Sequence, residues 1–129
     1  MMAVNNTSIL TDNMDYCIIC NRPKQATHHL LSGIANRRLS DQDKVIVPLC
    51  YDHHCGKYGI HTVREVEVLG KIIGQIAWEK NYILNLLVEM ILKKNGVKDN
   101  LKETRSEEWH RINDEAREAF RSRYGKSFI

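Results

Sequence analysis

The chain has 129 residues, a net charge of +3, 43% hydrophobic residues and 27% charged residues. This length suits about one domain, and the composition is that of an ordinary globular protein, which excludes wholesale disorder. The longest apolar run, Tyr82 to Leu92, is interrupted by Asn85 and Glu89. It is shorter than the roughly 20 residues that a membrane span needs, so no membrane partner is expected.

The composition also bears on location and on nucleic-acid binding. The N-terminus has no basic stretch leading into an apolar one, so no secretory signal is expected and the expected location is the cytoplasm. In that compartment the four cysteines are better explained as metal ligands or thiols than as disulfides. Positive charge is spread along the chain and argues only weakly for nucleic acid. One basic cluster, near the C-terminus, consists of Arg117, Arg121, Arg123 and Lys126.

The N-terminal half divides into an arm and a small module. Residues 1–12 are polar and without periodicity, which predicts a flexible arm. Residues 13–61 hold all four cysteines and both prolines between short apolar runs, a composition typical of a module built around metal ligands. Within it, 26–31 and 44–49 are predicted to form short strands because of their length and, in the second, their β-branched residues. The segment between them is predicted to be a polar loop.

Residues 62–129 are predicted to be helical, because apolar residues recur there at three- and four-residue steps. A first helix reaches Ala77, and a second helical stretch covers 82–91 and stops at Asn95-Gly96. Gly70 and Gly74 in the first helix indicate close packing against another element. A last helix opens at Ser106 and stops at Gly125, and the apolar stripes place Trp78 and Trp109 in the core.

The cysteines predict a structural zinc site. Cys17 and Cys20 are separated by two residues, a spacing at which two thiolates can reach one ion, and Cys50 is followed by His53 and Cys55. The predicted ligands are Cys17, Cys20, Cys50 and His53, with Cys55 as the alternative fourth ligand. Four unrelated buried thiols are the other interpretation, which the paired spacing disfavours.

The remaining histidines of the module predict a second metal site. His28 and His29 end a predicted strand, while His54 and His61 flank a glycine-containing turn after the second cysteine pair. The zinc cross-link can bring these four imidazoles together without a large core. Neighbours on a regular strand point to opposite faces, so His28 and His29 share a site only if the strand ends or twists there.

The strings CIIC, THHLLSG and VPLCYDHHCGKYGIH, within residues 15–61, resemble the His-Asn-His (HNH) endonucleases of the ββα-metal superfamily, in particular compact phage-type members with a Cys-x2-Cys zinc knuckle. The resemblance implies an α+β fold in which a zinc-stapled module packs against C-terminal helices as a single compact domain. It also implies a phage-encoded protein that acts inside a bacterial host.

The resemblance further implies metal-dependent hydrolysis of DNA phosphodiester bonds. His29 would be the general base, and the catalytic metal would be held by His28, His54 and His61. An all-imidazole shell favours Mn²⁺, Ni²⁺ or Zn²⁺ over Mg²⁺. The expected phosphate contacts come from basic residues around the module, Arg37, Arg38 and Lys57, and from the basic C-terminal tail.

One feature departs from the family pattern and supports a rival function. The middle Asn of the family, which holds the loop that carries the base, falls near Val45, and a Val side chain cannot make that hydrogen bond. Asn36, Asp41 or Asp43 could replace it. The rival is a catalytically inactive, zinc-finger-like DNA-binding or adaptor module. A homodimer formed through the apolar stretch 82–91 is a further possibility.

Overall fold

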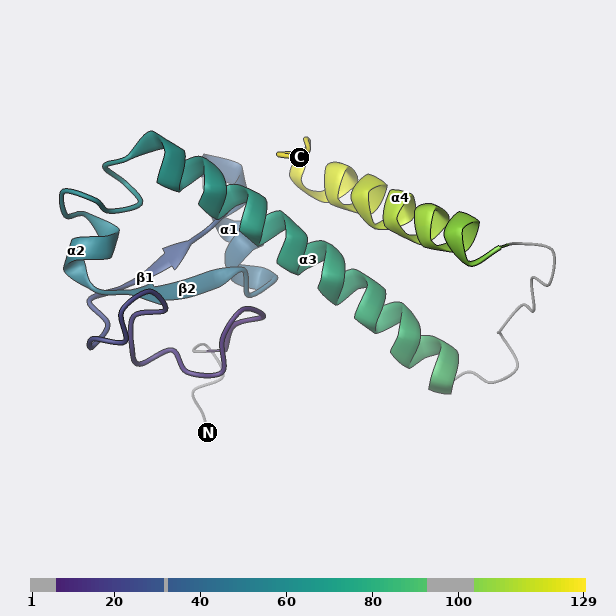
Figure 1. Cartoon of the computed structure of the whole chain (residues 1–129), viewed down its shortest axis with the longest axis horizontal. Helices are drawn as coiled ribbons and strands as arrows, with labels where there is room; N and C mark the ends of the chain where they lie inside the picture. Colours follow the sequence, from purple (N-terminus) through teal and green to yellow (C-terminus); the bar gives the residue numbers. More distant parts are fainter. Residues whose placement is uncertain (1–6, 32, 93–103) are drawn as a thin grey trace. The chain divides into compact units, whose positions relative to one another are not determined.

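A computed structural model of the chain describes residues 7–31, 33–92 and 104–129. Its architecture is α+β, as predicted, with two short strands and helices of very different length (Figure 1). Among the described residues, no helix is both long and apolar enough to cross a membrane. The elements follow the order β1 (Ala26–His29), α1 (Ile34–Gln42), β2 (Ile46–Leu49), α2 (Tyr51–His54), α3 (Arg64–Leu92) and α4 (Arg105–Tyr124).

The described residues form two compact units. The first unit runs to Ala77 and includes Phe128 and Ile129, and the second covers Trp78 to Ser127. This division falls within α3, after Ala77, whereas the boundary predicted from the sequence lies after residue 61; the domain limits stay a prediction. The first turns of α3 pack on the residues around the strands, so they belong to the first unit.

The two predicted strands are present in slightly shorter form and make an antiparallel pair. His28 lies opposite Val47 and His29 lies opposite Ile46. All residues of β2 are buried, which agrees with the β-branched, apolar character of this segment. β1 ends at His29. The strand therefore ends at the pair of histidines, as a site shared by both residues requires.

The segment between the strands is a helix, α1, and the prediction of a polar loop was wrong. Among the side chains of this helix that the structure describes, Ser40 alone is buried, so the segment has the polar composition of a loop. Ser40 is fully buried and donates its hydroxyl to the carbonyl oxygen of Val45 at 2.7 Å, whereas Arg37 and Arg38 are exposed. Arg and Leu39 are good helix formers, so local propensity permits the helix that packing selects.

The predicted flexible arm is only partly described. Residues 1–6 lie outside the described residues. In the part that follows, Ser8 donates its hydroxyl to the carbonyl oxygen of Ile46 at 2.6 Å and the amide of Ile9 donates to Lys44 at 3.0 Å. The chain before the module is therefore held against β2.

The two helical stretches predicted after residue 62 are one helix, α3. Nothing between Gln75 and Leu92 is a Gly or a Pro, so the apolar pattern can change face without a break in the helix. The predicted stop at Asn95-Gly96 lies outside the described residues.

The predicted close packing of the α3 glycines is confirmed. A Cβ on Gly74 would lie 3.1 Å from both Leu30 Cβ and Val45 Cγ1 and 3.2 Å from Leu31 Cδ2, and one on Gly70 would lie 2.8 Å from Ile60 Cδ1. The helix backbone thus lies directly on the apolar residues that flank the strands. This contact shields Leu30, Leu31 and Val45 from solvent.

The second unit is a helical pair closed by aromatic contacts. Ala116, Phe120 and Tyr124 of α4 are buried, and the ring centroids of Trp78 and Phe120 are 5.4 Å apart. The predicted core position of Trp109 was wrong, because this side chain is 65% exposed. It lies in the first turns of α4, before the buried positions begin. Helix α4 begins one residue earlier than predicted, with Thr104 as its N-cap.

Replacing Gly74 by Ala tests the helix contact. Overpacking costs roughly 1–3 kcal/mol, whereas Ala in a helix gains about 1 kcal/mol over Gly. We expect Gly74→Ala to lower the free energy of unfolding by roughly 1 kcal/mol, measured by urea denaturation.

Val68→Ala is the control, since Val68 is on the same helix and exposed and also gains helix propensity. It should be neutral or slightly stabilising. A Gly74→Ala chain that is more stable than the wild type would show that the close approach does not constrain α3.

Candidate metal centres

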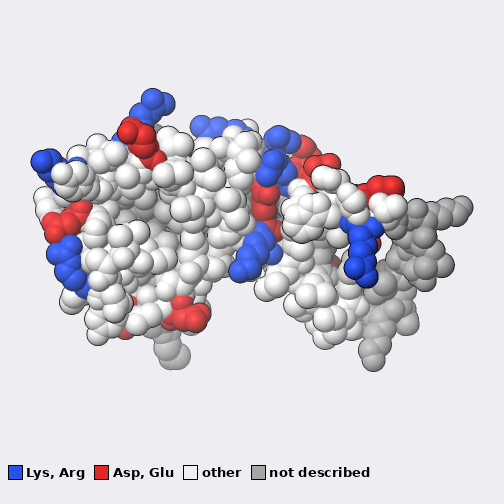
Figure 2. All heavy atoms as spheres, viewed as in Figure 1, with Lys and Arg blue, Asp and Glu red and all other residues white. Residues whose placement is uncertain are grey.

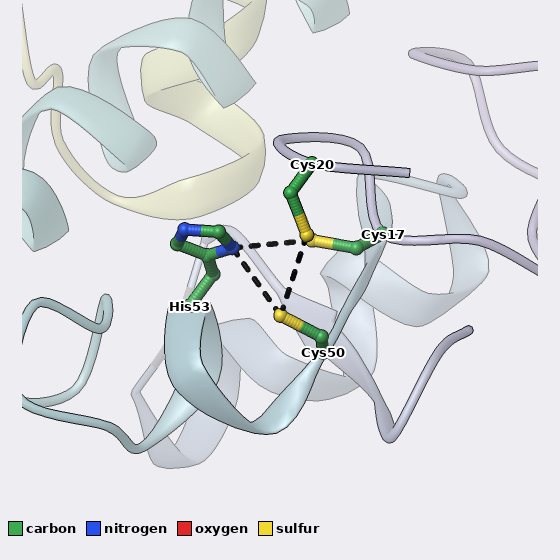
Figure 3. Close-up of side chains that lie close together, drawn as sticks. All are labelled: Cys17, Cys20, Cys50 and His53. Carbon is green, nitrogen blue, oxygen red and sulfur yellow. Dashed lines mark hydrogen bonds between the residues drawn. The ribbon is translucent and has the colours of Figure 1, made fainter. Parts of the chain in front are cut away.

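Three cysteines and one histidine of the first unit converge as a possible metal site (Figure 3). The Nδ1 atom of His53 lies 3.2 Å from Cys50 Sγ and 3.6 Å from Cys17 Sγ, and the Sγ atoms of Cys20 and Cys50 are 3.7 Å apart. One ligand atom from each residue lies within 4.8 Å of the others. A tetrahedral site with Zn–S bonds of about 2.3 Å places its sulfurs roughly 3.8 Å apart. The cluster therefore has the ligands and spacing to hold a metal ion such as zinc.

Local backbone hydrogen bonds place the first cysteine pair beside β2. The amide of Cys17 donates to the carbonyl of Arg22 at 2.7 Å, and that of Asn21 donates to Cys17 at 2.8 Å, which closes a tight loop. Asn21 has a φ of 64°, a conformation that Asn tolerates better than most residues. The amide of Ile18 donates to Pro48 of β2 at 2.9 Å. The loop is thus attached to the strand that leads to Cys50.

Arg22 supports this cluster from outside, a contact that the sequence analysis missed. Its Nε donates to Cys20 Sγ at 3.2 Å, and its guanidinium pairs with Asp52 at 3.0 Å. The hydrogen bonds from the side chain and backbone of Arg22 lower the pKa of Cys20 to about 6. The Cys20 thiolate, which is the form that binds metal, is therefore favoured at neutral pH.

Cys55, the alternative fourth ligand, is not part of this cluster. It is exposed, and its Sγ lies 3.3 Å from Nδ1 of His54. The structure therefore brings His53, and not Cys55, close to the thiols of Cys17, Cys20 and Cys50.

A second cluster consists of three imidazoles. His28 comes from β1, His54 from the end of α2 and His61 from the turn that follows. Their ring centroids are 4.8 Å (His28–His61), 5.6 Å (His28–His54) and 4.5 Å (His54–His61) apart. One nitrogen of each ring lies within 4.8 Å of the others. The three histidines predicted to share a second ion are thus adjacent in space.

The turn after α2 brings His61 to this cluster. Its amide donates to the carbonyl of His54 at 3.0 Å, and the amide of Ile60 donates to that of His53 at 2.9 Å. A Cβ on Gly59 would lie 2.7 Å from the carbonyl oxygen of His54. Only Gly permits so close a return of the chain, which explains the glycine between the two predicted ligands.

The donor chemistry of the second cluster fits a cation. Burial and the neighbouring rings of His61 and His54 lower the pKa of His28 to about 4, and burial also lowers the pKa of His54. Both rings are therefore neutral at physiological pH, and each keeps a nitrogen lone pair. Three imidazoles at this spacing suit a transition ion better than Mg²⁺.

His29 and Arg37 share a pocket with the imidazole cluster. The pocket has a volume of about 470 Å³ and is lined by Thr27, His28, His29, Gly33, Arg37, His54 and His61. Nε2 of His29 lies 3.3 Å from Oδ1 of Asp41 on α1. Of the three residues considered as replacements for the middle Asn, Asp41 is the one with a hydrogen bond to His29. Val45, near which that Asn falls, is fully buried.

The predicted phosphate-contacting residues differ in their distance from this pocket. Arg37 lines it, and Arg38 lines an adjoining depression together with His29, Arg37 and Asp41. Lys57 lies in the turn after α2, with Nζ 5.5 Å from the ring centroid of Tyr58, and lines neither of these pockets. The arginines of α1 are thus the basic side chains next to the imidazoles.

The basic C-terminal residues are partly engaged with acidic ones. Arg117 lies 3.4 Å from Glu79 and Arg121 lies 2.9 Å from Glu118. On the face shown in Figure 2, Lys and Arg side chains are interspersed with Asp and Glu. Neither observation adds to the case for a basic tail that binds nucleic acid.

Comparison of the chain with protein-family models, with curated proteins and with solved structures gives no match. Its function has to be inferred from the two side-chain clusters and the pocket beside one of them.

Metal analysis of variants tests whether the two clusters bind separate ions. We expect one tightly held zinc per chain and a second, exchangeable ion. Cys50→Ser should lose the zinc and unfold the first unit, because a structural zinc contributes about 10 kcal/mol or more to small metal-built modules. His54→Ala should keep the zinc and lose the second ion. Elemental analysis after dialysis and calorimetric titration with Mn²⁺ measure the two losses.

Matched residues outside the clusters supply the controls. Cys55→Ser removes a thiol and His110→Ala removes an exposed imidazole on α4, and both variants should bind both ions. Zinc that survives Cys50→Ser but not Cys55→Ser would contradict the ligand assignment.

Proposed function

We propose that this chain is a metal-dependent endonuclease of the HNH type that hydrolyses DNA phosphodiester bonds. The observation that carries the proposal is the composition of one pocket. It combines three clustered imidazoles able to hold an ion, a further imidazole at the end of β1, and an arginine from α1. An ion site, a base and a phosphate-binding cation are the three components that hydrolysis of a phosphodiester needs.

The arrangement of elements supports assignment to the ββα-metal fold. The pocket is formed where β1 and the helix that follows β2 come together, with His28 and His29 on the strand and His54 on α2. The Cys17, Cys20, Cys50 and His53 cluster includes the N-cap residue of α2 and a residue within α2, and it would act as the structural zinc site.

The residues of the pocket have distinct roles in the proposed reaction. His28, His54 and His61 would hold the catalytic ion, which when bound supplies Lewis-acid stabilisation of phosphate charge. His29 accepts a proton from the attacking water, a task for which imidazole is suited near neutral pH. Arg37 binds a non-bridging phosphate oxygen. The water oxygen bonds to phosphorus and the bond to the 3′-oxygen breaks, which leaves 5′-phosphate and 3′-hydroxyl ends.

A second candidate function is an inactive DNA-binding or adaptor module. Its specific support is the apolar, buried Val45 near the place of the family's middle Asn. This candidate keeps the zinc cluster and the fold but predicts binding without cleavage.

Plasmid nicking distinguishes the two candidates. We expect the purified chain with Mn²⁺ to convert supercoiled plasmid to the open circular form. His29→Ala should reduce the rate by about 10²- to 10⁴-fold, the usual contribution of a general base, while the zinc content and the unfolding midpoint stay unchanged.

His110→Ala is the matched control and should nick at the wild-type rate, since His110 is an exposed histidine in the first turns of α4 and belongs to neither cluster nor the pocket. A wild-type chain that is inactive with Mg²⁺, Mn²⁺, Ni²⁺ and Zn²⁺ would favour the adaptor.

A homodimer stays a separate prediction. The stretch proposed to form it exposes Leu84, Leu87, Val88 and Ile91 of α3, which lie on one side of a helix by their spacing. We expect light scattering of the full chain to give twice the monomer mass, and Leu87→Glu to return it to the monomer mass. A monomer at high concentration contradicts this prediction.

A further inference from the structure

We propose that Asp41 is a positioning residue for His29: its carboxylate accepts a hydrogen bond from Nε2–H, so that Nδ1 is the nitrogen that takes the proton from water. The inference rests on the proposed nuclease function. It goes beyond it by assigning a residue on α1, an element that the sequence did not predict as a helix. The carrying observation is the 3.3 Å distance between His29 Nε2 and Asp41 Oδ1.

Both partners are held by the fold. His29 is the last residue of β1, and its side chain is only 17% exposed. Asp41 is 62% exposed, but it follows Ser40, which is fully buried and bonded to the carbonyl of Val45. The helix is thus anchored next to the carboxylate, so Asp41 approaches His29 from a fixed direction.

Asp41 belongs to neither group of potential metal ligands. Among the described residues one group consists of Cys17, Cys20, Cys50 and His53, and the other consists of His28, His54 and His61. His29 is also outside them, although it lines the pocket of the imidazoles. A carboxylate beside a non-ligating imidazole is therefore placed to orient the imidazole rather than to bind the ion.

The chemistry of the pair determines which nitrogen acts. An ionised carboxylate only accepts hydrogen bonds, so Nε2 has to be the donor. A neutral imidazole with hydrogen on Nε2 has its lone pair on Nδ1. When Nδ1 takes the proton from the attacking water, the ring becomes positive, and the carboxylate of Asp41 stabilises that charge. The proton that the departing 3′-oxygen needs comes from solvent.

The first arm of the test measures plasmid nicking with Mn²⁺. Asp41→Ala should lower kcat by about 10- to 100-fold, the usual loss for a residue that orients a functional group, with KM and zinc content unchanged. Asp41→Asn should recover most of this loss, because the amide oxygen can still accept the hydrogen bond. Asp43→Ala, which removes the same charge two residues away, should nick at the wild-type rate.

The second arm needs no activity. In the ¹H–¹⁵N spectrum of the zinc-loaded full chain, assigned with His29→Gln, we expect a downfield Nε2 proton of His29. This signal should be lost in Asp41→Ala and kept in Asp41→Asn.

The outcomes separate the two proposals. Wild-type activity in Asp41→Ala, or no hydrogen-bonded Nε2 proton in the wild type, overturns the role of Asp41 and leaves the nuclease proposal standing. An inactive wild type with a visible Nε2 proton overturns the nuclease proposal while the pairing of Asp41 and His29 stands. Equal losses in Asp41→Ala and Asp41→Asn also overturn the positioning role, since the hydrogen bond alone would not account for them.

Discussion

The orientation of α2 is the constraint on which both clusters of potential metal ligands depend. His53 and His54 are neighbours on this one-turn helix, and successive residues of a helix point about 100° apart. His53 therefore meets the three thiols while His54 meets His28 and His61. Cys50 is the N-cap of the same helix, so an ion bound by Cys50 and His53 would fix the helix at both ends. The first cluster and the pocket are thus connected through α2, a helix of one turn. Disruption of the first cluster should therefore also disturb the second.

Both groups of ligands could be predicted from the sequence because each is defined by residue type and short spacing. The paired cysteines and the histidines after Cys50 have few ways to meet, and the glycine before His61 indicates the return of the chain that the structure shows. The choice between His53 and Cys55 could not be made from spacing, since both follow Cys50 within reach of an ion. It depends on the helical turn of α2, which carries His53 back toward Cys50 and leaves Cys55 beyond its end.

The contacts around the pocket could not be predicted, because they depend on how α1 packs. Residues 34–42 have a polar composition that suits a loop, and among the described side chains of the helix the buried one is Ser40, which bonds to Val45. Asp41 is close to His29 only because this segment is helical. The same limitation applies to Trp109, whose apolar character indicated the core although the buried positions of α4 begin later. Short amphipathic helices are selected by tertiary packing more than by local propensity.

The charge distribution sets what the proposed site can recognise. Arg37 and Arg38 are the basic side chains beside the imidazoles, while Arg117 and Arg121 are already paired with carboxylates. Contacts between arginines and phosphates position a nucleic acid without reading its bases. The pocket itself presents imidazoles, an arginine and a threonine, and these groups suit a phosphate and an ion. A nuclease with this site would therefore have little sequence preference of its own. Selection of a particular DNA would have to come from the structure of that DNA or from another protein that recruits the enzyme.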